Sequence, residues 1–95
     1  MVRQGDLLIT KVLDIPIGSK IDTTGILLRG ESTGHAHRIS GGELLRKGEA
    51  MFLNVGKKAV ISHEEHKPIT LGKGKWGVVR QREYVSADMV RVVVD

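Results

Sequence analysis

The sequence contains no cysteine and very few aromatic residues. Without cysteine, disulfides and thiolate metal sites are excluded. With one Phe, one Trp and one Tyr, the core must consist mostly of Val, Ile and Leu. No apolar run approaches the ~20 residues of a transmembrane helix, and the N-terminus lacks an apolar signal-peptide core. These absences lead us to expect a cytoplasmic protein.

The length and charge of the chain narrow its class only broadly. Ninety-five residues suit one domain covering residues 1–95. The formal net charge is +4 and the sequence pI is about 9.7, which is compatible with RNA binding. The basic side chains are scattered, however, and no run of five or more like charges occurs. A solvated basic surface is therefore favoured over a dedicated nucleic-acid patch.

Short β-forming segments separated by turn residues run through the whole chain, and no segment has the periodicity of an amphipathic helix. This pattern predicts an all-β fold, a small single-domain barrel or sandwich. Residues 41–42, both glycine, predict a two-residue hairpin turn that would place His37 opposite Arg46. Residues 56–58 and 72–74 predict further turns. The expected strands cover residues 6–13, 25–29, 35–40, 43–47, 49–55, 59–63, 69–71, 75–85 and 89–94.

All four histidines lie in two short segments, residues 34–38 and 63–66. His35 and His37 are two positions apart, so on a strand both imidazoles lie on the same face. His63 and His66 are three apart, a spacing that suits a turn. Because neutral imidazole is a common ligand of transition metals, the two segments together predict a metal site.

We expect His35, His37 and His63 to form this site, with His66 joining them if the bend at residues 64–65 folds back. The metal would be a divalent transition metal such as zinc, nickel, manganese or iron. Three histidines with an open position would favour catalysis, whereas four would favour a structural role. Neither the substrate nor the reaction can be identified from the sequence. The carboxylates that could substitute as ligands are Glu31, Glu43, Glu64 and Glu65.

The order of these residues resembles the cupin pattern, in which a His-x-His pair on one strand is followed by a Glu and by a further His from a later strand. Here the corresponding residues are Gly30, His35, His37, Glu43 and His63. The resemblance implies a cupin-like β-barrel. Residues 30–38, 63–69 and 81–84 more closely resemble small uncharacterised prokaryotic and phage-associated proteins. That resemblance covers most of the chain and implies a compact β fold without an assigned activity.

One alternative is an RNA-cleaving enzyme that works without a metal. Two imidazoles across a cleft can act as general base and general acid. His37 would pair with His63 or His66 in these roles. The phosphate would be held by Lys67, Arg38 or Arg80.

A second alternative is a structural or assembly module. Residues 90–94 are β-branched apart from one arginine. Such a segment can form an edge strand that pairs with another copy, so this reading predicts a homo-oligomer.

Overall fold

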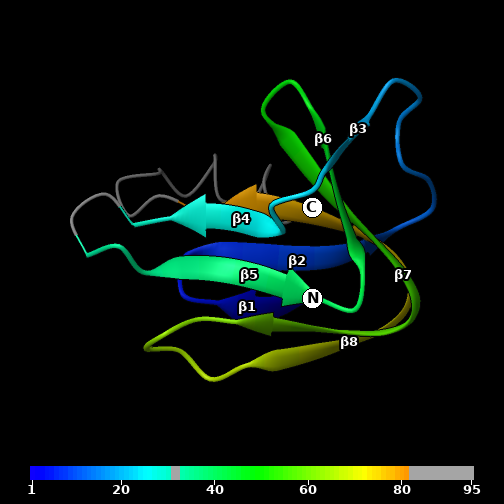
Figure 1. The fold of residues 1–95 in the computed structure, drawn as a ribbon. Coiled ribbons are helices and arrows are strands. Elements are labelled where there is room, and N and C mark those ends of the chain that lie inside the picture. The colour runs from blue at the N-terminus through cyan, green and yellow to red at the C-terminus, as the bar shows by residue number, and fades with distance from the viewer. Residues whose placement is uncertain (31–32, 82–95) are drawn as a thin grey trace.

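The computed structural model describes residues 1–30 and 33–81 of the chain. Every regular element within these two ranges is a β-strand (Figure 1). The all-β prediction is therefore confirmed. No helix in the described part of the chain is long and apolar enough to cross a membrane. The strands are β1 (Val2–Gln4), β2 (Leu7–Val12), β3 (Lys20–Asp22), β4 (Ile26–Arg29), β5 (Ala36–Ser40), β6 (Glu43–Lys47), β7 (Ala50–Ser62) and β8 (Ile69–Arg80).

The strands form one antiparallel sheet with the order β1-β2-β8-β7-β5-β4, and β6 branches from β7 to pair with β3. Among the described strands, β1 and β4 each pair on one side only. Since these two ends of the path do not pair with each other, the sheet is not closed into a barrel. The barrel expectation is therefore wrong for this part of the chain, and the likeness to cupins stays a prediction.

Strands β7 and β8 are longer than the sequence predicts because two expected turns are absent. Gly72 lies opposite Lys58 and Gly74 lies opposite Val55, so the glycines continue the ladder. The pairing shifts register between Val55 and Lys58, which is the irregularity that a glycine inside a strand often marks. Cross-strand hydrogen bonding thus overrides the local turn preference.

The predicted hairpin around residues 41–42 is also wrong, because β5 and β6 do not pair with each other. Strand β5 pairs with β4 and β7, so His37 lies opposite Leu28 rather than Arg46. Gly41 has a φ of 90°, and a Cβ at this position would lie 2.6 Å from the backbone oxygen of Lys58. The chain therefore turns in close contact with β7 and leaves β5 for a different neighbour.

The core is aliphatic, as the scarcity of aromatic residues predicts. Its burial supplies the main favourable free energy of folding. Trp76 is only partly buried and packs at the edge of this core. The core residues are Leu7, Ile9, Leu27, Leu44, Met51, Leu53, Val55, Ala59, Ile61, Leu71 and Val78. The strand predicted at residues 89–94 lies outside the described residues.

Candidate histidine site

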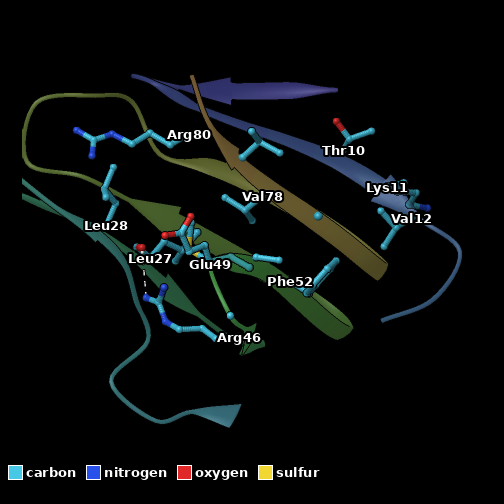
Figure 2. A pocket seen from close by; sticks show the side chains of 15 residues that line it. Thr10, Lys11, Val12, Leu27, Leu28, Arg46, Glu49, Phe52, Val78 and Arg80 are labelled. Carbon is cyan, nitrogen blue, oxygen red and sulfur yellow. Dashed lines mark hydrogen bonds between the residues drawn. The ribbon is translucent and has the colours of Figure 1, made fainter. Parts of the chain in front are cut away.

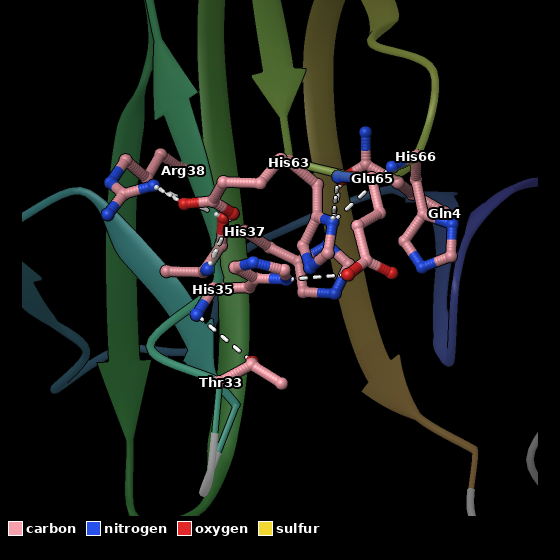
Figure 3. Close-up of polar contacts among 10 residues, drawn as sticks. Gln4, Thr33, His35, His37, Arg38, His63, Glu65 and His66 are labelled. Carbon is pink, nitrogen blue, oxygen red and sulfur yellow. Dashed lines mark hydrogen bonds and ion pairs between the residues drawn. The ribbon is translucent and has the colours of Figure 1, made fainter.

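The two histidine segments meet at one end of the sheet (Figure 3). His35 directly precedes β5 and His37 is its second residue, and His63 and His66 come from the turn that follows β7. The ring centroid of His63 lies 4.4 Å from that of His37, 4.6 Å from that of His66 and 5.7 Å from that of His35. The structure therefore brings together all four residues that the sequence singled out, with His63 at the centre.

His37 is held from behind by Gln4, a residue that the sequence did not single out. Both side chains are buried, with relative exposures of 4% and 2%. The Nδ1 atom of His37 lies 2.8 Å from Oε1 of Gln4. Burial lowers the pKa of His37 below its ordinary value, the charge of His63 lowers it further, and Asp6 opposes these effects. His37 is therefore neutral at pH 7, the form that acts as a metal ligand or a base.

His35 is held in a similar way by Glu65 from the facing turn. Its Nδ1 atom lies 3.1 Å from Oε1 of Glu65. The carboxylate accepts the Nδ1 proton, so Nε2 of the neutral ring keeps its lone pair. Metal-binding histidines commonly have this carboxylate-to-imidazole arrangement, which orients the ring and raises the basicity of the other nitrogen.

His63 carries its proton on the other ring nitrogen from His35 and His37. Its Nδ1 atom accepts hydrogen bonds from the backbone N–H groups of Glu65 at 3.0 Å and His66 at 3.4 Å. A neutral ring that accepts at Nδ1 carries its proton on Nε2. His63 can therefore donate from Nε2 as it stands. It can bind a metal through that atom only after losing the proton or giving up the backbone hydrogen bonds.

The turn between β1 and β2 closes the site on the side of His66. Gly5 has a φ of 59°, and a Cβ at this position would lie 2.7 Å from Nε2 of His66. Asp6 follows, with Oδ1 3.8 Å from Nε2 of His37. Sequence reasoning missed residues 4–6 because their contacts join positions about 30 to 60 apart in the chain. The only local signal was the Gly-Asp turn.

Glu64 belongs to a possible metal-binding group, because ligand atoms of His35, His63 and Glu64 all lie within 4.8 Å of one another. Both of its carboxylate oxygens are already engaged. Oε1 accepts from Arg38 at 2.7 Å, and Oε2 accepts from the backbone N–H of Ala36 at 2.9 Å. The hydrogen bond from Arg38, with that from Ala36, lowers the pKa of Glu64 to about 2. Glu64 thus ties the turn to β5.

The other expected carboxylates stand differently. Glu65 contacts His35, as described above. Glu43 lies on β6 opposite Asn54 and accepts a hydrogen bond from that side chain at 3.4 Å, in a different part of the sheet. Glu31 lies outside the described residues. The two carboxylates of the turn therefore support the site from its rim.

The arginines that were expected to hold phosphate contact these carboxylates instead. Arg38 pairs with Glu64 at 2.7 Å, and Arg80 pairs with Asp6 at 3.0 Å. Lys67 contributes its backbone oxygen, which accepts from Nε2 of Gln4 at 2.9 Å. The surroundings of the histidines are consequently acidic or charge-paired, which favours a cation over an anion.

A hollow of about 1040 Å³ lies elsewhere in the molecule and has no histidine in its lining (Figure 2). Its lining includes Phe52, Val78 and Arg46. Arg46 is already bound to Asp22 and to the backbone oxygen of Ile26, both at 2.7 Å. Because this arginine is already paired, the hollow is a weaker candidate for a functional site than the histidine cluster, despite its size.

Fold and site together define an open, all-β domain with a histidine cluster at one end of its sheet. The family model described as "Domain of unknown function (DUF8820)" matches residues 3–81. The chain belongs to this family, and the match spans both histidine segments. No curated protein and no solved structure matches the chain.

Proposed function

We propose that the protein binds a divalent transition metal at the four-histidine cluster, with His35 and His37 as the ligands already oriented by their partners and His63 and His66 completing the site from the turn. The observation that carries the proposal is the way the first two rings are held. Glu65 engages Nδ1 of His35, and Gln4 engages Nδ1 of His37. Both rings therefore keep Nε2 for a ligand, as happens in metal sites where a carboxylate or an amide holds the other nitrogen of a metal-binding histidine.

The charges around the cluster support the same proposal. Asp6, Glu64 and Glu65 lie on its rim, and the first two are bound to arginines. Both oxygens of Glu64 are engaged, and Asp6 and Glu65 are each bound through one oxygen. The imidazole nitrogens are therefore the main available ligands. Such a donor set suits zinc, nickel or iron, and suits the oxygen-preferring calcium and magnesium poorly. A site with three nitrogen ligands would keep an open position for a substrate, so a small metalloenzyme is the form of the function we favour.

One observation favours the metal-free acid–base alternative. His37 offers a lone pair at Nε2, whereas His63 carries its proton at Nε2, and their ring centroids are 4.4 Å apart. These are the complementary protonation states of a general base and a general acid. RNA cleavage would also need a cation free to hold the phosphate. Arg38 and Arg80 are both paired with carboxylates. Within the described residues this leaves Lys67 as the one expected cation without an ion pair, which ranks this alternative second.

The test is the metal content of the untagged protein as purified and after incubation with zinc, nickel, manganese or iron. We expect about one metal per chain, and loss of that metal in both His35→Ala and His63→Ala. Ser40→Ala, an exposed position on β5, is the matched control and should keep the metal.

Different outcomes separate the alternatives. Absence of metal from the folded wild-type protein under all four conditions would refute the proposal. RNA cleavage that continues in chelator and is lost in His37→Ala would establish the acid–base function instead. Loss of metal in His35→Ala but not in His63→Ala would show that the two segments do not share one metal.

A further inference from the structure

Gln4 is one of only two buried polar or charged residues in the described part of the chain, and the other is His37, its partner. A buried amide of this kind must satisfy its hydrogen bonds within the protein. Nε2 of Gln4 donates to the backbone oxygens of Ile61 and Lys67, each at 2.9 Å. Oε1 lies 2.8 Å from Nδ1 of His37.

This set of partners determines the orientation of the amide. A flipped Gln4 would place Oε1 against two carbonyl oxygens, which cannot donate, and both hydrogen bonds would be lost. Oε1 must therefore face His37. An amide oxygen only accepts, so Nδ1 of His37 must carry the proton.

From this network we infer that Gln4 is a positioning residue that holds neutral His37 in the Nδ1–H tautomer and so leaves its Nε2 lone pair, which faces Asp6 at 3.8 Å, available to a ligand. Gln4 also connects the two histidine segments, because its side chain contacts His37 and bonds to a residue on each side of the turn that carries the second segment. One of its acceptors, Ile61, precedes His63 by two residues, and the other, Lys67, follows His66 directly. The same side chain thus orients one ring and fastens both ends of the turn that carries two others.

Any effect of Gln4 on metal affinity rests on the proposed function. The tautomer of His37, in contrast, is a property of the metal-free protein. It is therefore tested first without metal, by long-range ¹H–¹⁵N NMR of the imidazole rings at a pH where His37 is neutral. We expect the wild-type protein to show a protonated Nδ1 and an unprotonated Nε2 for His37.

Two variants separate positioning from folding. Gln4→Met has a similar size but no acceptor, so His37 should become a mixture of tautomers. Gln4→Glu retains an oxygen facing Nδ1 and should restore the Nδ1–H form, even though its carboxylate cannot donate to Ile61 and Lys67 and lowers stability. Val2→Ala removes the packing of a partly buried residue on the same strand, and it should leave the tautomer unchanged.

An Nε2–H tautomer of His37 in the wild-type protein would overturn the inference, and so would an unchanged Nδ1–H form in Gln4→Met. If Gln4→Met does not fold, the wild-type protein and Gln4→Glu decide the question. The Nδ1–H form of His37 in both supports the inference, and the Nε2–H form in the wild-type protein overturns it. With zinc added, Gln4→Met should bind zinc about 10- to 100-fold more weakly than wild type, the usual loss when the residue that hydrogen-bonds to a metal-binding histidine is removed. A wild-type protein with the expected tautomer but without zinc affinity would refute the proposed function and leave this inference standing.

Discussion

The two halves of the histidine site are built differently. The half on β5 belongs to the sheet: His37 is buried, and it is held by a buried glutamine. The half on the turn after β7 is more exposed, and in the described part of the chain no buried side chain hydrogen-bonds to the rings of His63 and His66. The turn is held by its own backbone contacts, by its two glutamates and by the hydrogen bond from Gln4 to Lys67. One half therefore presents a ligand atom that is already oriented, and the other can adjust.

This difference matters for what each half contributes. A pre-oriented ligand loses little conformational entropy on binding, whereas ordering an exposed side chain costs free energy. His63 must in addition release its Nε2 proton or its backbone hydrogen bonds before it binds a metal. We therefore expect the sheet half to dominate affinity and the turn half to complete the coordination.

The largest effect should come from comparing His37→Ala with His66→Ala. Loss of His37 should weaken zinc binding by more than about 100-fold. Removing a residue that only holds a metal ligand in place costs less, roughly 10- to 100-fold. Loss of His66 should cost clearly less, since this ring has the less constrained position. Isothermal titration calorimetry with zinc measures both. Equal losses would show that the two halves contribute alike, and a larger loss for His66→Ala would reverse the comparison.

A smaller effect is expected at Glu65, which reaches across from the turn to orient His35. Its side chain is 65% exposed, so its hold on the ring is weak. Glu65→Ala should reduce zinc affinity about 10-fold. This is the low end of the loss that follows when a residue holding a metal-binding histidine is removed. Glu65→Gln keeps an acceptor for Nδ1 of His35 and should recover part of that loss.

Glu49→Ala provides the control for Glu65→Ala, because it removes the same charge at a position lining the hollow away from the histidines. The zinc affinities of both variants are measured by isothermal titration calorimetry, and that of Glu49→Ala should match that of the wild-type protein. Equal losses in the two variants would mean that net charge, and not the contact with His35, sets the effect of Glu65.

The sequence predicted the strand character of most segments and the four site histidines, because alternation along a strand and clustering of one residue type are local signals. The continuity of β7 and β8 was missed because pairing with a neighbouring strand makes glycine acceptable in the middle of a strand. Gln4 was missed for a related reason. Its three partners lie 33 to 63 residues away, and nothing around position 4 indicates them.

The hydrogen bonds of Glu64 resemble those of Asp22, a carboxylate outside the two histidine segments, more than those of a metal ligand. The smallest predicted effect comes from comparing these two carboxylates. Each carboxylate is bound to an arginine and to a nearby hydrogen-bond donor. The pKa of Asp22 is lowered to about 2 by the Thr24 hydroxyl and then by Arg46, as the pKa of Glu64 is by Arg38 and Ala36. Lowered pKa values therefore occur both inside and outside the candidate site, and they do not identify it alone.

Because the folded-state pKa of Glu64 lies below its ordinary value of 4.5, its ionised form stabilises the folded protein. That contribution is complete above about pH 4.5 and is lost as the pH falls toward 2. Glu64→Gln should move the acid-unfolding midpoint slightly to higher pH, as should Asp22→Asn, and circular dichroism would detect both shifts. Only Glu64→Gln should also alter the NMR signals of His35 and His63, since Glu64, unlike Asp22, ties the turn to β5. Unchanged histidine signals in Glu64→Gln would mean that the turn keeps its position without this contact.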